Sequence, residues 1–188
     1  MPWGLIITLV VVALIVLWFI AVNNKLKRLK VVIAEAWSGI DVQLKRKANI
    51  LPNLVDTLKM QMKFEEDVLT KLTAARSGLA SSDRAEAMAA NEKLNSIIPT
   101  IRATAEAYPE LGTNASFLQM MNDIRDCEDK VTYARTRYNM SVSTYNQVIV
   151  VFPDSIVAGM IGCTPEKMFE IAETARAEAD DLRIGNLK

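Results

Sequence analysis

The segment Leu5–Val22, LIITLVVVALIVLWFIAV, is an uninterrupted apolar run that carries no charge and one polar side chain, Thr8. As an α-helix rising about 1.5 Å per residue, it would be roughly 27 Å long. That length is close to the ~30 Å hydrocarbon core of a bilayer. The run is hydrophobic around its whole circumference, which favours a membrane-spanning helix over a helix that buries one face against a soluble core.

The residues around this run indicate a retained anchor rather than a cleaved signal peptide. Met1–Gly4 contains no basic side chain, and Phe19–Val22 offers no small-x-small cleavage site. Trp3 and Trp18 lie near the two ends of the run, where aromatic side chains favour the membrane interface. We therefore predict a membrane anchor over residues 1–24, with a span of about 5–22, followed by one helical domain over residues 25–188.

Basic residues directly after the run predict the orientation. The first charged side chains are all basic, and the first acidic residue is Glu35. By the positive-inside rule, the N-terminus lies outside and the helical domain in the cytoplasm, in a single-pass protein of the bacterial cell (inner) membrane. The same basic side chains are expected to attract anionic lipid headgroups, at about 1 kcal/mol each. They are Lys25, Lys27, Arg28 and Lys30.

Composition narrows the classes of function. The chain is formally neutral, but nine basic and three acidic residues fall between Lys25 and Lys63, next to the predicted anchor. The basic residues are not interleaved with aromatic side chains, as they are in many nucleic-acid-binding proteins, so we expect no nucleic-acid partner. There is no histidine, the commonest general base and metal ligand. Cys127 and Cys163 lack metal-ligand spacing, and we expect both to be small buried side chains in a reduced cytoplasmic domain.

The spacing of apolar residues predicts helices and no strand. From Leu26 onwards these residues recur every three or four positions, which predicts an amphipathic helix nearly continuous with the span and ending near Gly78. Pro52 is expected to kink or locally break this helix. Asp83 and Glu86 resemble a capping arrangement, so a second helix should begin there and end near Tyr108.

Two further helices are expected in the C-terminal half. A long stripe without glycine or proline runs from Phe117 to Phe152, and Pro153 should end it. Thr164-Pro165-Glu166 has the order of an N-cap, a first-turn proline and a first-turn acid, which predicts a last helix to about Leu182. The expected fold is all-α: a single transmembrane helix, then an antiparallel, coiled-coil-like bundle of three long helices and a shorter fourth.

Several short motifs occur along nearly the whole chain. The first are Ala36-Trp-Ser-Gly-Ile-Asp-Val-Gln-Leu-Lys-Arg46 and Leu51-Pro-Asn-Leu-Val55. The others are Glu106-Ala-Tyr-Pro109, Arg137-Tyr-Asn139, Tyr145-Asn146, Phe152-Pro153 and Val157-Ala-Gly159. In this order, and over nearly the whole chain, these motifs resemble those of the LemA family. The resemblance implies a single-span membrane protein with a bundle of long helices, and it implies no particular reaction. Some members of the family are linked to envelope stress or to membrane proteases.

Polar side chains inside these motifs are the candidates for a functional site. Chemistry would require a nucleophile or an acid–base pair in a pocket, and no phosphate loop, GxSxG turn or di-metal spacing is present. We expect hydrogen bonds between helices to be the role of these side chains, with partner binding and catalysis as the alternatives. They are Asp41, Gln43, Asn53, Glu106, Tyr108, Arg137, Tyr138, Asn139, Tyr145 and Asn146.

The expected function is a non-enzymatic scaffold, anchored in the membrane, that self-associates at the bilayer without catalytic residues, metal or cofactor. The short apolar segment 155–162 is expected to pack across the end of the bundle, with contact to a membrane or partner surface as the alternative. Its apolar side chains at Ile156, Val157, Met160 and Ile161 are also candidates for contacts between copies. The alternative is an adaptor or regulator of a membrane protease or of an envelope-stress partner. A third class, an enzyme acting on lipid or peptidoglycan precursors, would need a polar cleft that the periodicity does not indicate.

Overall fold

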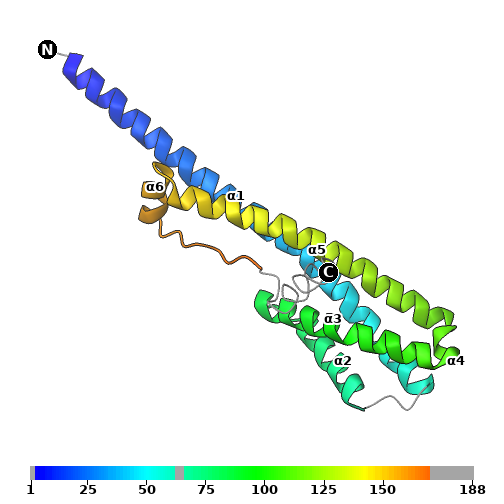
Figure 1. The fold of residues 1–188 in the computed structure, drawn as a ribbon. Coiled ribbons are helices and arrows are strands. Elements are labelled where there is room, and N and C mark those ends of the chain that lie inside the picture. Colours follow the sequence, from blue (N-terminus) through cyan, green and yellow to red (C-terminus); the bar gives the residue numbers. More distant parts are fainter. Residues whose placement is uncertain (1–2, 62–65, 170–188) are drawn as a thin grey trace, which may run out of the picture. The chain divides into compact units, whose positions relative to one another are not determined.

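A computed structural model describes residues 3–61 and 66–169, and in these ranges it contains helices and no strand (Figure 1). The helices are α1 (Trp3–Gln61), α2 (Glu66–Leu79), α3 (Arg84–Ala107), α4 (Pro109–Gly112), α5 (Ala115–Val150) and α6 (Asp154–Met160). The chain divides into two compact units, Glu35–Thr136 and a second unit made of Met1–Ala34 with Arg137–Lys188. The predicted all-α class is confirmed.

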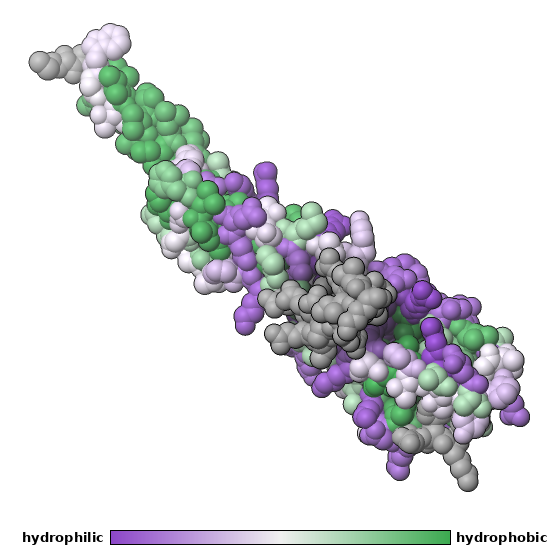
Figure 2. Space-filling model, viewed as in Figure 1, coloured by the Kyte–Doolittle hydropathy of each residue, from purple (hydrophilic) through white to green (hydrophobic). Residues whose placement is uncertain are grey.

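Helix α1 confirms the continuity expected between the span and the first amphipathic helix. It extends without interruption from Trp3 to Gln61 and passes through Pro52, so the proline does not end the helix. The expected end near Gly78 is wrong, because α1 ends at Gln61 and Gly78 belongs to a separate helix, α2, which packs against α3. Every side chain from Trp3 to Leu17 is exposed, and Figure 2 shows an apolar surface over this part of α1. Among the described helices, α1 alone is long and apolar enough to cross a membrane, which is compatible with membrane anchoring.

In the unit Glu35–Thr136, α1 and α5 pack antiparallel. Arg46 on α1 forms ion pairs with Asp123 and Asp126 on α5, at 3.2 and 3.0 Å. Helices α2 and α3 form a hairpin beside them (Figure 1). Fully buried leucines and isoleucines from the predicted stripes form the core, because spacings of three and four place them on one face of each helix. They include Ile40, Leu44, Leu54, Leu58, Leu72, Leu79, Leu94 and Ile101.

The start of α3 confirms the predicted cap. Asp83 Oδ1 accepts a hydrogen bond of 2.8 Å from the backbone N–H of Glu86, and the helix begins at Arg84. Ser81 adds to this cap, because its hydroxyl accepts from the backbone N–H of Asp83 and donates to the Glu86 carboxylate. Pro99, like Pro52, lies inside a helix that continues past it. After Tyr108, where a turn was expected, the chain forms the single-turn helix α4.

Gly78 has a role that its sequence position near a helix end does not reveal. It lies inside α2, and a Cβ atom built on it would be 2.6 Å from the Cβ atom of Ala90 on α3. Real Cβ atoms do not approach so closely, and neither side chain has a rotatable bond that could move the atom away. The absent side chain at Gly78 therefore permits the close approach of α2 and α3.

Gly78→Ala is expected to destabilise the α2–α3 hairpin by about 1–3 kcal/mol, as other overpacking substitutions do. The gain in helix propensity, up to about 1 kcal/mol, opposes this effect only in part. The thermal midpoint of the purified protein, followed by far-UV circular dichroism, checks the prediction. Adding Ala90→Gly should restore part of the loss because it removes the atom that the new Cβ meets. A stabilised Gly78→Ala variant would show that the helices separate at little cost.

The C-terminal region differs from the prediction. Helix α5 ends at Val150, as expected from Pro153, and a short helix, α6, follows. Gly162, with φ of 70°, then redirects the chain into a segment, Cys163–Phe169, that is not helical. The predicted helix start at Thr164 is therefore wrong, because side chains of α5 bind the backbone of this segment, as described below. The remainder of the predicted helix, residues 170–182, lies outside the described residues.

Candidate functional site

A buried lysine joins three helices in the unit Glu35–Thr136. Lys47 on α1 is fully buried, and its Nζ atom donates to Asn91 Oδ1 at 2.7 Å, Asn95 Oδ1 at 3.0 Å and Glu128 Oε2 at 2.5 Å. Asn91 Nδ2 also donates to Glu128 Oε2, at 3.1 Å. The three ammonium protons are thus all used, which is the condition under which a buried charge is tolerated. We call these four residues the Lys47 cluster.

Burial and a neighbouring carboxylate shift the pKa of Lys47. Burial lowers the pKa of Lys47 below its ordinary value of 10.5, while the Glu128 carboxylate opposes this shift by attraction and hydrogen bonding. The ammonium group therefore depends on its partners to remain charged. Helices α1, α3 and α5 each supply a member of the cluster, so its hydrogen bonds form only when the three helices pack in this way. Hydrogen-bonded polar groups in a core are a known means of specifying one packing of helices.

The sequence analysis missed this cluster, although one signal for it was present. Lys47 falls at a position of the apolar stripe on α1, between Leu44 and Leu51, where a charge must be either buried or turned outward. Asn91 likewise lies between Met88 and Leu94 on the stripe of α3. A polar residue at a stripe position on each of two helices predicts an internal polar contact.

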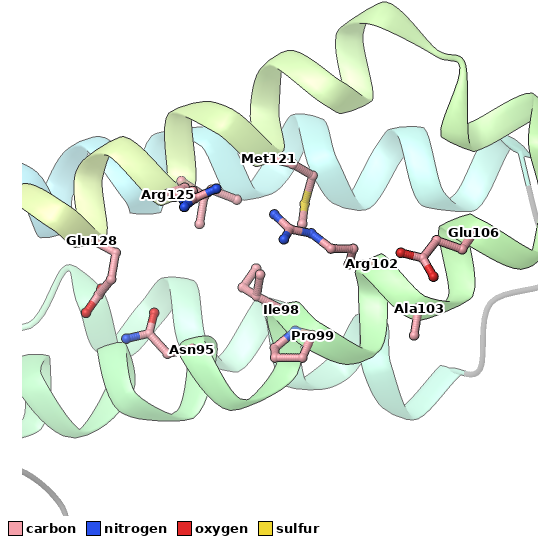
Figure 3. A pocket seen from close by; sticks show the side chains of 10 residues that line it. Asn95, Ile98, Pro99, Arg102, Ala103, Glu106, Met121, Arg125 and Glu128 are labelled. Atoms are coloured by element: carbon pink, nitrogen blue, oxygen red, sulfur yellow. The ribbon is translucent and has the colours of Figure 1, made fainter. Parts of the chain in front are cut away.

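A pocket of about 470 Å³ adjoins the Lys47 cluster, between α3 and α5 of the same unit. Figure 3 shows Arg102 from α3 and Arg125 from α5 over the middle of it, with Glu106 near one end and Glu128 near the other. The remaining lining is mainly apolar: Ile98, Pro99, Ala103, Met121 and Ile124, with Asn95. These residues could hold a side chain or a small molecule, but they include no serine, cysteine or threonine that would act as a nucleophile.

A second polar site lies on α5 in the other unit. Asn146 forms two hydrogen bonds with the backbone of Glu166: its Oδ1 accepts from the N–H and its Nδ2 donates to the C=O, both at 2.9 Å. Asn139 binds the N–H and C=O of Phe169 in the same way, at 2.9 and 2.8 Å. The hydroxyl groups of two tyrosines lie 3.3 Å from further carbonyl oxygens, Tyr145 at Thr164 and Tyr138 at Lys167.

These contacts repeat with a regular register. The pair Tyr138-Asn139 recurs seven residues later as Tyr145-Asn146, and the contacted backbone positions recur after three residues. Seven helical residues rise about 10.5 Å, and three extended residues cover about 10 Å. The two spacings match, so α5 holds an extended segment that runs antiparallel to it. We call Tyr138, Asn139, Tyr145 and Asn146 the Tyr-Asn track.

The Tyr-Asn track corrects the expected role of its residues. Hydrogen bonds between helices were expected, whereas the asparagines bind an extended backbone. Burial and a hydrogen bond with Cys163 raise the pKa of Tyr145, which keeps its hydroxyl group protonated and able to donate. The Tyr138 ring also lies 4.9 Å from the Phe169 ring, measured between centroids. Apart from these contacts with the side chains of Cys163 and Phe169, the track contacts main-chain atoms of the bound segment.

The other candidate residues are not brought together with the track. Asp41 forms an ion pair with Lys45 on the same helix, and Gln43 is half-buried. Asn53, Tyr108 and Arg137 are exposed, and Glu106 lines the α3–α5 pocket. Cys127 is a buried free thiol whose pKa is raised by burial, while Cys163 is half-buried. Among the residues that the structure describes, no three His, Cys, Asp or Glu side chains form a possible metal site.

Comparison with known proteins identifies relatives of the chain. The model of the LemA family matches residues 36–181. The protein is also similar to Protein LemA of Metamycoplasma hominis, at 26% identity over 170 residues. That alignment covers 89% of this chain and 78% of the relative.

Proposed function

The chain belongs to the LemA family, and on this premise we propose that it is a non-enzymatic, membrane-anchored helical scaffold that self-associates at the bilayer. Helix α1 supports the anchor, because its apolar N-terminal part is exposed and is continuous with the helix that packs in the body. A continuous helix of this kind would join the anchor to the helical domain in every copy without an intervening loop. Confinement to one plane also raises their effective concentration, so weak lateral contacts suffice for assembly.

A row of exposed apolar side chains on α1 supports self-association more directly than any other observation. Leu9, Ile20 and Val31 are 61%, 47% and 56% exposed. They recur every eleven residues, and at about 100° per residue this spacing returns to within about 20° of the same face. Lipid would cover this face at Leu9, but Val31 lies beyond the span and remains uncovered. A second copy of α1 would bury it.

The basic residues after the span support the proposed orientation. Lys27, Arg28 and Lys30 are exposed and available to anionic headgroups, and the Lys30 ammonium also lies 5.7 Å from the centre of the Tyr145 ring. Under the proposal, these side chains face the cytoplasmic leaflet of the inner membrane, where anionic lipids give a negative surface potential.

The native mass of the protein, extracted in polymer nanodiscs with its own lipids, tests self-association. The expected result is one discrete mass of several chains, which decreases when Val31→Lys places a charge in the apolar row. Met140→Lys is the matched control, because Met140 is an exposed apolar residue of the same unit on α5. A mass of one chain per disc at native expression level would overturn the scaffold.

The alternative is an adaptor for a membrane protease or an envelope-stress partner. The α3–α5 pocket favours it, because an apolar floor beneath Arg102 and Arg125 would suit an acidic partner segment with an apolar side chain. A mass of one chain together with a co-extracted second protein would support this function over the scaffold. Arg102→Glu should then reduce the amount of that protein, while Arg137→Glu, at an exposed residue outside the pocket, should not.

A further inference from the structure

The part of α1 in which every side chain is exposed is shorter than a bilayer core. The exposed residues Trp3–Leu17 correspond to about 22 Å of helix, whereas the hydrocarbon core is ~30 Å thick. The apolar run continues to Val22, and Ile20 and Ala21 are exposed. On the other side of the helix, Trp18 and Phe19 are half-buried, and Val22 and Leu26 are 4% and 1% exposed. Protein therefore already covers one side of α1 where the span would leave the membrane.

The α5–α6 corner, defined as Val150–Gly162, lies at this level of α1. Lys25 Nζ on α1 forms an ion pair of 2.8 Å with Asp154 Oδ2, in the first turn of α6. Both residues belong to the same compact unit. Figure 1 shows α6 beside the part of α1 that follows the exposed apolar run. Lys25 is one helical turn beyond Val22, so the corner is adjacent to the end of the span.

The surface of the corner is apolar. Figure 2 shows apolar atoms where Figure 1 has α6. Asp154 is the only charged residue of the corner sequence, and its charge is paired with Lys25. Val157 and Ala158, on the opposite side of α6, are buried as core residues. The exposed apolar side chains are Val150, Val151, Phe152, Ile156, Met160 and Ile161.

We propose that the α5–α6 corner inserts into the bilayer leaflet from which α1 emerges, as a second membrane contact beside the span. Insertion supplies the missing thickness, because the corner and the covered end of α1 then cross the last part of the apolar layer together. It also gives the exposed apolar side chains an apolar surrounding, which is worth about 25 cal/mol per Å² of buried surface. The contact replaces the expected role of Ile156, Met160 and Ile161 between copies. The proposed insertion rests on the membrane anchoring in the proposed function and is independent of self-association.

Quenching by lipid-bound nitroxides tests the insertion in the full-length protein. A background without native cysteines, Cys127→Ala with Cys163→Ser, receives one new cysteine labelled with an environment-sensitive fluorophore. Phe152→Cys and Met160→Cys report on the corner, and Leu14→Cys reports on the span. Met140→Cys is the matched control, exposed on α5 about 15 Å before Val150. The labelled proteins are reconstituted in phosphatidylcholine–phosphatidylglycerol vesicles that contain nitroxide lipids, and far-UV circular dichroism verifies their helix content.

The expected result is a blue-shifted emission at residues 152, 160 and 14, quenched several-fold more strongly than at residue 140. Quenching at residue 14 together with labels at 152 and 160 that behave like the label at 140 would overturn the insertion and leave the anchor intact. A blue shift at residue 152 without lipid quenching would also overturn it, because a second copy would then cover the corner. Absence of quenching at residue 14 would contradict the anchor itself, and the insertion with it.

Discussion

Lys47→Met is expected to lower the free energy of unfolding by about 3–5 kcal/mol, as other removals of one partner from a buried ion pair do. The methionine has a similar length but no donors, so Asn91, Asn95 and Glu128 would lose the ammonium group that joins them. Denaturant unfolding in a mild detergent, followed by far-UV circular dichroism, measures this loss.

Lys45→Met is the matched control for this prediction. Lys45 lies two residues away on α1 and forms an exposed ion pair with Asp41 on the same helix. Exposed pairs of this kind contribute about 0.3–0.5 kcal/mol. Adding Glu128→Gln to Lys47→Met should recover part of the loss, since it removes the unpaired charge. Equal effects of the Lys45 and Lys47 substitutions would show that the Lys47 cluster does not hold the helices together.

The Lys47 cluster also predicts how stability depends on pH. Because the pKa of Lys47 is lower in the folded protein than its ordinary value of 10.5, the unfolded chain binds more protons between the two values. The contribution of Lys47 to stability should therefore increase as the pH rises from the lowered pKa to 10.5, and remain constant below and above this interval. Subtracting the pH profile of Lys47→Met from that of the unsubstituted protein isolates this contribution. If the free energy of unfolding of the unsubstituted protein, minus that of Lys47→Met, fell as the pH rises through this interval, the buried environment assigned to Lys47 would be contradicted.

The second large effect is expected at the Tyr-Asn track. Asn139→Ala with Asn146→Ala removes four hydrogen bonds to the segment Thr164–Phe169, which at about 1 kcal/mol each weakens its docking by about 4 kcal/mol. The exchange of backbone amide protons reports on this docking. In the unsubstituted protein, the amides of Glu166 and Phe169 should be protected, because each donates to an asparagine side chain.

Protection of these two amides should fall to the level of a free peptide in the double variant. Asn146→Ala alone should affect the Glu166 amide more than the Phe169 amide, because Asn139 still binds Phe169. The control is Gln147→Ala, because Gln147 is an exposed neighbour whose side chain donates to Ser143 on the same helix. Unchanged protection in the double variant would show that the asparagines do not hold the segment.

The sequence predicted the helices because local rules decide them. Apolar spacing located α3 and α5 and the start of α1, but it joined α1 and α2 into one helix. The Asp83 side chain marked the start of α3 within one residue. The family motifs also led to Tyr138, Asn139, Tyr145 and Asn146, which the structure brings together in one track. In each case the evidence lies within a few residues of the feature that it predicts.

Contacts between distant residues explain what could not be predicted. Thr164-Pro165-Glu166 has the local features of a helix start, but the track on α5 binds the backbone of this region in an extended form. The Lys47 cluster joins side chains about 40 to 80 positions apart, and no local pattern pairs them. Gly78 likewise owes its role to Ala90 on another helix.

Resistance of the protein to extraction from lipid vesicles tests the central claim, that α1 anchors the chain in a bilayer. The full-length protein, reconstituted in vesicles and washed at alkaline pH, is predicted to remain with the lipid and float with it in a density gradient. Val11→Arg with Leu14→Arg, which places two charges in the exposed apolar part of α1, should release it into the wash. Release of the unsubstituted protein under the same wash would contradict the anchor.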